Sequence, residues 1–201
     1  MKLPTHVLDT AKKLGLDYYQ QLEVTASSKG VSLMPWQVAS VNSLLADIIT
    51  WQPAVVIDAN ANIGSDTINF ARNLLATRII AIEKDPATYR LLQANTKMYA
   101  NVTAYEMSCV EYLRRLPAAD IIYFDPPWPE YRDYKLQAKV SLELDKINIL
   151  ELIREFLPKA RMVILKTPFN YADYDKLPGT VKKYDVVIDS KISFSLCVVT
   201  Q

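Results

Sequence analysis

The chain has 201 residues, half of them hydrophobic and 22% charged, so it can bury one core but is short for two. Its formal net charge of +1 excludes a protein that holds long nucleic acid by phosphate contacts alone, so any nucleic-acid substrate must be gripped locally. No apolar run approaches the roughly 18 residues that a membrane-spanning helix needs, and the start MKLPTHVLDTAKK lacks the apolar core of a signal peptide.

Cysteine and histidine are scarce. Cys109 and Cys197 lie far apart in the sequence, and His6 is the single histidine. This composition lacks the raw material for a metal site or for His-based nucleophilic catalysis. We therefore expect no metal. Together with the absence of a long apolar run and of a signal peptide, the two separate cysteines predict an intracellular protein, in cytoplasm or nucleus, without a membrane partner. We also expect a monomer. We expect one domain over residues 1–201, with an N-terminal helical extension at 1–50 and the sheet core at 54–201.

The N-terminal extension is expected to be helical. Residues 4–22 place apolar side chains from Val7 to Leu14 on one helical face, and residues 35–50 open with Pro35, a residue favoured at the first helical position. These two helices precede the sheet.

From residue 54, short apolar runs alternate with amphipathic segments, which is the pattern of βαβ units in a parallel sheet. The last two runs leave no room for a helix between them, so they must form an antiparallel hairpin. A polar and aromatic loop is expected over residues 125–145. We expect strands at Ala54–Asp58, Arg78–Glu83, Val102–Met107, Asp120–Phe124, Arg161–Thr167, Tyr184–Asp189 and Ile192–Thr200, and helices at residues 66–76, 86–99, 110–115 and 146–157.

The turn after the first strand, Asp58-Ala59-Asn60-Ala61-Asn62-Ile63-Gly64, is the expected ligand site, because open α/β sheets bind ligands beyond the carboxyl ends of their strands. Gly64 stands where the chain must turn tightly into a helix, and the asparagines tolerate left-handed backbone angles. Glu83 ends the second strand, where such folds bind both ribose hydroxyls. A plain turn and a solvated strand-end charge would give the same residues, so this pattern alone leaves cofactor binding open.

The glycine content narrows the choice of cofactor. The chain has four glycines and neither G-x-G-x-x-G nor G-x-x-x-x-G-K, the motifs that bring backbone against the phosphates of dinucleotides and nucleoside triphosphates. S-adenosylmethionine has no phosphate to cradle, so it suits this turn better.

Asp125-Pro126-Pro127-Trp128 follows the fourth strand and so lies on the same edge of the expected sheet. An exocyclic amine on a base is a poor nucleophile, because its lone pair is delocalised into the ring, so acceptors must bind its hydrogens. Asp125 supplies a carboxylate and Pro126 a carbonyl, while Trp128 offers a face on which a base can stack. A stiff Pro-Pro loop with Trp128 capping the core is the structural alternative.

The layout from Asp58 to Trp128 resembles class I methyltransferases, and more closely the trimethylguanosine synthases with their small viral or microbial relatives. In that family the first turn is similar to DANANIGSDTINFA, the second strand to IIAIEKDP, and an Asp or Ser precedes P-P-W. The resemblance covers about residues 30–200. It implies a Rossmann-like α/β fold with a mostly parallel seven-stranded sheet, helices on both faces and a C-terminal antiparallel hairpin, together with S-adenosyl-L-methionine as cofactor and 5′-capped RNA as partner.

The resemblance also implies roles for individual residues. Asp125 and Pro126 receive the guanine amine, and Trp128 stacks on the 7-methylguanine of the cap. On the substrate side stand also Pro127 and, as candidate phosphate ligands, Arg132 and Lys135. The cofactor side comprises the first turn and the ends of the second and third strands: Asp58, Ala59, Asn60, Gly64, Glu83, Lys84, Ser108 and Cys109.

Two other functions stay open at this level. Adenine amine methyltransferases acting on DNA or RNA also use an Asp-Pro-Pro-Trp loop, although this short chain has little room for the extra target-recognition domain that DNA enzymes often carry. A noncatalytic subunit that keeps the methyltransferase fold and binds RNA is the alternative from outside the enzymes.

Overall fold

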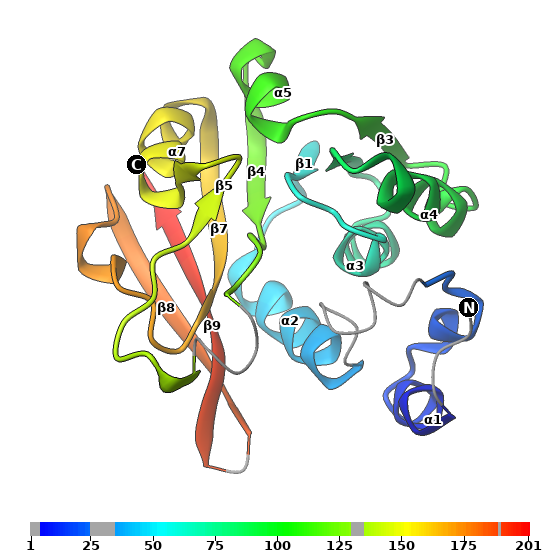
Figure 1. Ribbon diagram of the computed structural model, residues 1–201. Coiled ribbons are helices and arrows are strands. Elements are labelled where there is room, and N and C mark those ends of the chain that lie inside the picture. Colours follow the sequence, from blue (N-terminus) through cyan, green and yellow to red (C-terminus); the bar gives the residue numbers. More distant parts are fainter. Residues whose placement is uncertain (1–4, 25–34, 130–134, 189) are drawn as a thin grey trace. The chain divides into compact units, whose positions relative to one another are not determined.

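A computed structural model gives the structure of residues 5–24, 35–129, 135–188 and 190–201 (Figure 1). The predicted fold class is confirmed: the mostly parallel sheet has seven strands in the order β3-β2-β1-β4-β7-β9-β8. The strands are β1 (Val55–Asp58), β2 (Arg78–Glu83), β3 (Val102–Glu106), β4 (Ala119–Phe124), β7 (Ala160–Pro168), β8 (Thr180–Ile188) and β9 (Lys191–Thr200). The helices are α1 (Thr5–Lys13), α2 (Pro35–Ile48), α3 (Ser65–Asn73), α4 (Pro86–Thr96), α5 (Cys109–Arg115) and α7 (Ile149–Phe156).

Internal packing divides the chain into two compact units, which we describe in turn. The first unit combines Met1–Ala54 with Ala61–Met107, and the second combines Val55–Asn60 with Ser108–Gln201. Within the described parts of the chain, no helix is long and apolar enough to cross a membrane.

In the first unit, β2 and β3 pair in parallel from Ile79 opposite Val102 to Glu83 opposite Glu106. The apolar run of β2 is buried, whereas β3 leaves most of its side chains at least partly exposed. Helix α4 begins where Asp85-Pro86 predicted, because the Asp85 carboxylate accepts a hydrogen bond from the Thr88 N–H at 2.7 Å.

The prediction of one helix over residues 4–22 is wrong, because the helix stops at Lys13. Gly15 adopts a left-handed conformation with φ of 70°. The N–H of Gly15 then donates to the carbonyl of Lys12 at 3.1 Å, and the N–H of Leu16 donates to that of Ala11 at 2.9 Å. These two bonds form a Schellman cap, which glycine favours because it has no Cβ. A short 3-10 helix at Asp17–Gln21 follows.

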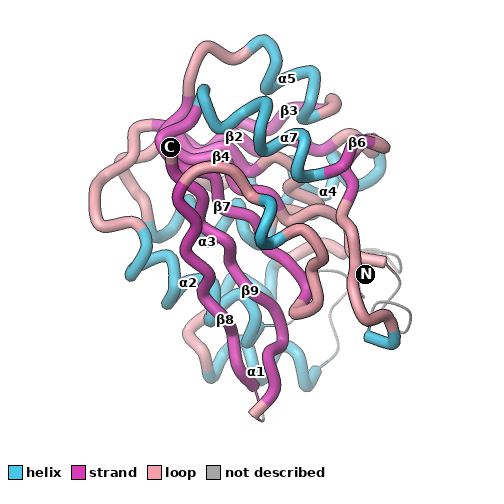
Figure 2. Tube along the Cα trace, turned by 90° about the vertical axis from the view of Figure 1, so that its left-hand side faces the viewer, coloured by secondary structure: helices cyan, strands magenta, loops and turns pink. Residues whose placement is uncertain are grey.

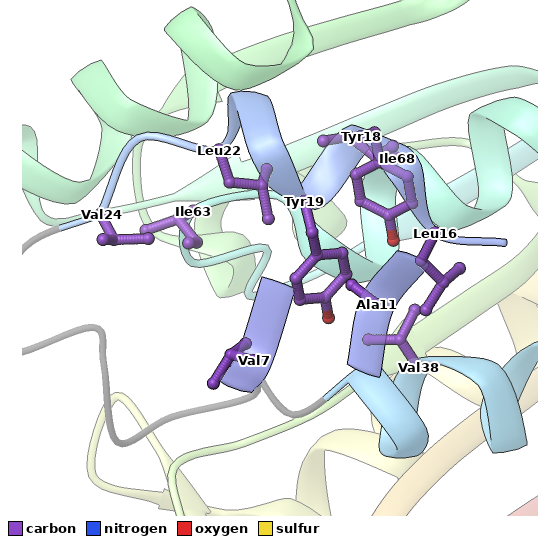
Figure 3. Close-up of a cluster of buried hydrophobic side chains, with 10 residues drawn as sticks. All are labelled: Val7, Ala11, Leu16, Tyr18, Tyr19, Leu22, Val24, Val38, Ile63 and Ile68. Atoms are coloured by element: carbon purple, nitrogen blue, oxygen red, sulfur yellow. The ribbon is translucent and has the colours of Figure 1, made fainter. Parts of the chain in front are cut away.

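The N-terminal segment packs on the helix that follows the first turn. Figure 3 shows its side chains gathered around the ring of Tyr19, together with Val38 of α2 and Ile68 of α3. The amide of Asn95 in α4 adds a polar link: it accepts from the N–H of Glu23 at 2.7 Å and donates to the carbonyl of Ile63 at 2.9 Å. This link ties the end of the segment to the turn before α3.

In the second unit, β1, β4 and β7 run parallel, with Asp58 opposite Tyr123 and Phe124 opposite Leu165. Strand β9 pairs antiparallel with both β7 and β8, as the predicted hairpin requires. Figure 1 draws this hairpin in orange and red, and Figure 2 shows its two strands side by side. Strand β8 begins at Thr180, earlier than the predicted Tyr184.

The predicted helix over residues 146–157 begins three residues late, at Ile149. A small antiparallel ribbon of β5 (Glu143–Leu144) and β6 (Ile147–Asn148) takes up the residues before it. Between its strands, Asp145 and Lys146 both have positive φ, of 53° and 64°, as a type I′ turn requires. The Asn148 side chain then accepts from the Leu150 N–H at 2.8 Å and so starts the helix.

Candidate active site

Asn60 ties the first turn to the loop after β4. Its side-chain oxygen accepts from the backbone N–H of Asp125 at 3.1 Å, and its Nδ2 donates to the backbone carbonyl of the same residue. Just before it, the N–H of Ala59 donates to the carbonyl of Tyr123 at 2.9 Å, and Asp58 is buried at the end of β1. The end of β1 therefore continues its pairing with β4 through a side chain.

The rest of the first turn, in the first unit, has the backbone shape predicted for it. Asn62 has a φ of 50°, and Gly64 has a φ of 94° immediately before α3. A Cβ at Gly64 would lie 2.9 Å from Cδ1 of Leu92 and 3.1 Å from Cγ2 of Thr96. Glycine is favoured there by its φ, and a side chain would also push against the ends of Leu92 and Thr96.

Glu83 holds this turn from the end of β2. Its carboxylate accepts from the N–H of Asn62 at 3.1 Å and from the N–H of Asp85 at 2.8 Å. Burial raises the pKa of Glu83, and the backbone N–H donors of Asp85 and Asn62 oppose that rise. Lys84 lies next to it and is exposed. A half-buried carboxylate beside a tight turn suits the two hydroxyls of a ribose.

Ser108 and Cys109 stand at the start of α5 in the second unit. The hydroxyl of Ser108 accepts from the Glu111 N–H at 3.4 Å and donates to Oδ2 of Asp145, in the ribbon turn, at 2.6 Å. The Cys109 side chain is buried. Ser108 thus links the end of the third βα unit to the β5–β6 ribbon.

The four residues after β4 differ in exposure. Pro126 is buried, Pro127 is exposed, and Asp125 and Trp128 are half-buried. Oδ2 of Asp125 lies 2.7 Å from Nζ of Lys166, with 11% and 4% of the two side chains exposed. Asp125 is therefore held through its backbone by Asn60 and through its carboxylate by Lys166.

Lys166 was not among the residues predicted for the site. It lies in β7, directly after the apolar run Met162-Val163-Ile164-Leu165, and is 3% exposed. A lysine that interrupts a buried strand needs a partner, because lysine is almost never buried unpaired. The interrupted run was thus a signal in the sequence, although it could not name Asp125 as the partner.

Of the two predicted phosphate ligands, Lys135 is among the described residues. Lys135 is exposed after the Pro-Pro loop, and Arg132 lies outside the described residues. The described residues contain no group of three or more His, Cys, Asp or Glu side chains that could hold a metal ion.

The residues of the first turn and of the end of β2 fit S-adenosylmethionine. They provide a carboxylate for ribose hydroxyls and a tight turn with one glycine, without the glycine-rich loop that phosphates need.

Solved structures share this fold at low sequence identity. A protein provisionally assigned as a class I S-adenosylmethionine-dependent methyltransferase from Listeria monocytogenes matches with a TM-score of 0.62 and 12% identity, over 96% of this chain and 68% of that chain. One provisionally assigned as an RNA methyltransferase from Pyrococcus horikoshii has a TM-score of 0.61 and 13% identity, over 99% and 98% of the two chains. Another, provisionally assigned as an O-methyltransferase from Klebsiella pneumoniae, has a TM-score of 0.55 and 16% identity, over 97% of this chain and 88% of that chain.

These matches and the strand order define the fold of a class I methyltransferase. The sequence model of one family, RNA cap guanine-N2 methyltransferase, matches residues 53–192. The chain therefore belongs to the RNA cap guanine-N2 methyltransferase family. It is an S-adenosylmethionine-dependent methyltransferase, and S-adenosyl-L-methionine is its cofactor.

Proposed function

We propose that this methyltransferase transfers a methyl group to the exocyclic amine of guanine, N2, in the 7-methylguanosine cap of an RNA. Asp125, held at the end of β4 by Asn60 and Lys166, is the observation that carries this proposal. Its carboxylate and the carbonyl of Pro126 accept hydrogen bonds from the amine, which orients the nitrogen lone pair. Membership of the RNA cap guanine-N2 methyltransferase family supports the same reaction.

The Asp125 carboxylate suits the donors of guanine. Guanine presents two neighbouring donors, N1–H and the N2 amine, and a carboxylate only accepts hydrogen bonds. Adenine amine methyltransferases share the Asp-Pro-Pro-Trp loop, so the choice of guanine over adenine rests on the family model. Because Asp125 forms an ion pair with Lys166, it presents acceptors to the base.

Trp128 supplies affinity for the base. It is half-buried after Pro127, and stacking on an aromatic side chain contributes about 1 to 3 kcal/mol per base. The ring of 7-methylguanine carries a positive charge, which the face of a tryptophan attracts. An unmethylated guanine lacks this second contribution, so Trp128 favours a capped end over an internal guanine.

The cofactor side of the proposal takes the residues predicted from the sequence. S-adenosylmethionine, when bound, would supply the methyl group: the amine nitrogen takes it as the bond between methyl carbon and sulfur breaks, S-adenosylhomocysteine leaves, and the nitrogen gives up one proton to solvent. Glu83 binds the ribose hydroxyls, and Gly64 keeps the turn close. The other residues on this side are Asp58, Ala59, Asn60, Lys84, Ser108 and Cys109. Lys135 and Arg132 contact phosphates of the cap or of the RNA.

The test is a methyl-transfer assay with labelled S-adenosylmethionine and three acceptors: an RNA with a 7-methylguanosine cap, the same RNA with an unmethylated guanosine cap, and an uncapped RNA. Mass spectrometry of the nucleosides should find the new methyl on N2 of 7-methylguanosine. In Trp128→Ala, kcat/KM should fall about 10- to 100-fold, the equivalent of losing one stacked base, and Trp128→Phe should keep most of the activity. Label on the adenine amine, or equal labelling of capped and uncapped RNA, would contradict the proposal.

A further inference from the structure

Lys166 is a buried cation at the end of the strand that neighbours the Pro-Pro loop. It follows Leu165, which pairs with Phe124, and Asp125 is the residue after Phe124. Parallel pairing of β4 and β7 therefore brings the two charged side chains together, at 2.7 Å between Nζ and Oδ2. The ring of Phe194 on β9 lies 5.5 Å from the Nζ atom. The buried ammonium group is therefore in contact with a carboxylate and an aromatic ring.

Stability alone does not explain such a pair. Removing two charges from water costs more than a buried ion pair commonly returns, so hydrophobic replacements of similar volume are often as stable or more stable. Lys166 follows the buried residues Val163, Ile164 and Leu165 along β7 and is itself 3% exposed, so an apolar residue would suit its position. The ion pair stands instead at the carboxylate proposed to receive the base amine.

The contacts of Asp125 hold it at three points. Asn60 holds the backbone N–H and the backbone carbonyl, and Lys166 holds the carboxylate through Oδ2. A carboxylate has about four acceptor positions on its two oxygens, more than one ammonium group occupies. Fixed acceptors that need no rearrangement during the reaction are the most effective form of electrostatic catalysis.

We propose that Lys166 is a positioning residue for methyl transfer: its ammonium group fixes the rotamer of Asp125, so that the carboxylate presents a fixed acceptor to the substrate amine. This role rests on the proposed function only in requiring an amine acceptor at Asp125. Lys166 acts through Asp125 and not on the substrate or the cofactor.

The test compares Lys166→Met and Lys166→Gln with the wild-type enzyme. Met removes the cation, and Gln keeps a neutral donor of similar length. We expect kcat to fall about 100-fold in Lys166→Met, because misplacing a catalytic group by about 1 Å costs that much, and by less in Lys166→Gln. The KM for S-adenosylmethionine should stay within about twofold, which a general loss of structure would not allow.

The chain offers a matched control pair on the same sheet. Lys183 lies 3.1 Å from Asp185 and 5.5 Å from the ring of Tyr174, so it repeats both contacts of Lys166, but it is part-exposed on β8. Lys183→Met should leave kcat within about twofold of wild type, because exposed ion pairs contribute little. Asp125→Asn with Lys166→Met removes both charges, and its kcat should exceed the product of the two single effects.

The outcomes distinguish a failure of the Lys166 role from a failure of the proposed substrate. Wild-type activity on adenine in place of the cap overturns the proposed function, and the series is then measured on that acceptor. A folded Lys166→Met enzyme with wild-type kcat overturns the role of Lys166. If Lys166→Met does not fold, Lys166→Gln decides, and wild-type kcat there has the same meaning. A wild-type enzyme that labels no amine overturns the role of Asp125 and Lys166 together.

Discussion

The side-chain amide of Asn60 makes two hydrogen bonds to one residue, accepting from the N–H of Asp125 and donating to its carbonyl. In a parallel pair the N–H and C=O of one residue bond to two different residues of the neighbouring strand, so the single amide of Asn60 takes the place of two backbone partners. The sequence resemblance assigns Asn60 to the cofactor. Its contacts assign it equally to the loop that is proposed to orient the base.

Replacing Asn60 by Ala should therefore lower kcat by about 100-fold, because the Asp125 backbone loses both bonds and the carboxylate moves. The Kd for S-adenosylmethionine, measured by calorimetry, should change less. Asn101→Ala is the matched control: its amide donates to the carbonyls of Ala71, Leu74 and Thr77 in the first unit, so its loss should cost stability and not kcat. If Asn60→Ala loses cofactor binding but keeps the wild-type kcat, Asn60 acts only in binding the cofactor.

The ionisation of Glu83 gives a pH dependence. Burial raises its pKa above the ordinary glutamate value, so as the pH falls it takes up a proton before an exposed glutamate would. The linkage sign follows: the contribution of Glu83 to folding stability is present below its unfolded pKa and is lost as the pH rises through its folded pKa. Cofactor binding has the opposite sign, because two ribose hydroxyls need an ionised carboxylate.

The affinity for S-adenosylmethionine should consequently fall as the pH is lowered towards the ordinary glutamate pKa of about 4.3, and the fall should begin at a higher pH than an exposed glutamate would give. Glu83→Gln should bind more weakly at neutral pH and lose this slope. Calorimetry across the pH range measures both effects. Glu151→Gln, in an exposed position on α7, should keep the wild-type slope. An unchanged slope in Glu83→Gln would show that another group titrates.

Among the elements, those with a strong local pattern were predicted correctly. The apolar runs of β1, β2, β4 and β7 and the space-limited hairpin needed only periodicity and length. The end of the helix before Gly15 could have been predicted, because Lys12-Lys13 followed closely by a glycine is a typical helix C-terminus. The apolar spacing from Val7 to Leu14 favoured a longer helix instead. The β5–β6 ribbon was not, because Asp145-Lys146 lacks the glycine of a typical type I′ turn.

The candidate site divides in the same way. Gly64 and Glu83 could be predicted from their residue types in the first turn and at the end of the second strand. The Asp125–Lys166 pair, by contrast, joins residues 41 positions apart. That contact depends on the register of β4 against β7, which no local pattern specifies. The same holds for the contact of Ser108 with Asp145, which depends on the ribbon turn.

The N-terminal segment provides a test of packing at the scale of one element. The Tyr19 hydroxyl is buried, and no described residue accepts its hydrogen bond. The neighbouring Tyr18 hydroxyl lies 3.5 Å from the carbonyl of Ser65 at the start of α3, a long hydrogen bond. The two hydroxyls thus differ in one described hydrogen bond, and the ring of Tyr18 also lies 5.3 Å from the guanidinium carbon of Arg72.

Tyr19→Phe should raise the free energy of unfolding by about 1 kcal/mol, because it removes a buried polar group without a partner among the described residues. Tyr18→Phe removes a bonded hydroxyl and should lower it by up to about 1 kcal/mol. Urea unfolding of both variants measures the difference. If Tyr19→Phe is destabilised as much as Tyr18→Phe, the Tyr19 hydroxyl has a partner such as an ordered water.

At the scale of the whole molecule, charge balance limits how RNA can be held. The chain has 23 Lys and Arg against 22 Asp and Glu. Several of the cations are already paired, as Arg114 is with Glu155 and Lys176 with Asp173. A chain with this balance lacks the large positive charge that holds long nucleic acid, so we expect the affinity for the proposed substrate to come mainly from the cap and from a few phosphate contacts.

This balance predicts a weak salt dependence. Each phosphate contact to a single strand changes log K by about 0.7 per tenfold change in salt, so one or two contacts should lower kcat/KM for capped RNA only about 3- to 7-fold between 50 and 200 mM salt. Lys135→Ala and Arg132→Ala should each remove about one contact from the slope. Lys182→Ala, exposed on β8, should leave it unchanged. If the slope of log kcat/KM against log salt corresponds to six or more phosphate contacts, a basic surface elsewhere holds the RNA. The cap would then not be the main source of affinity.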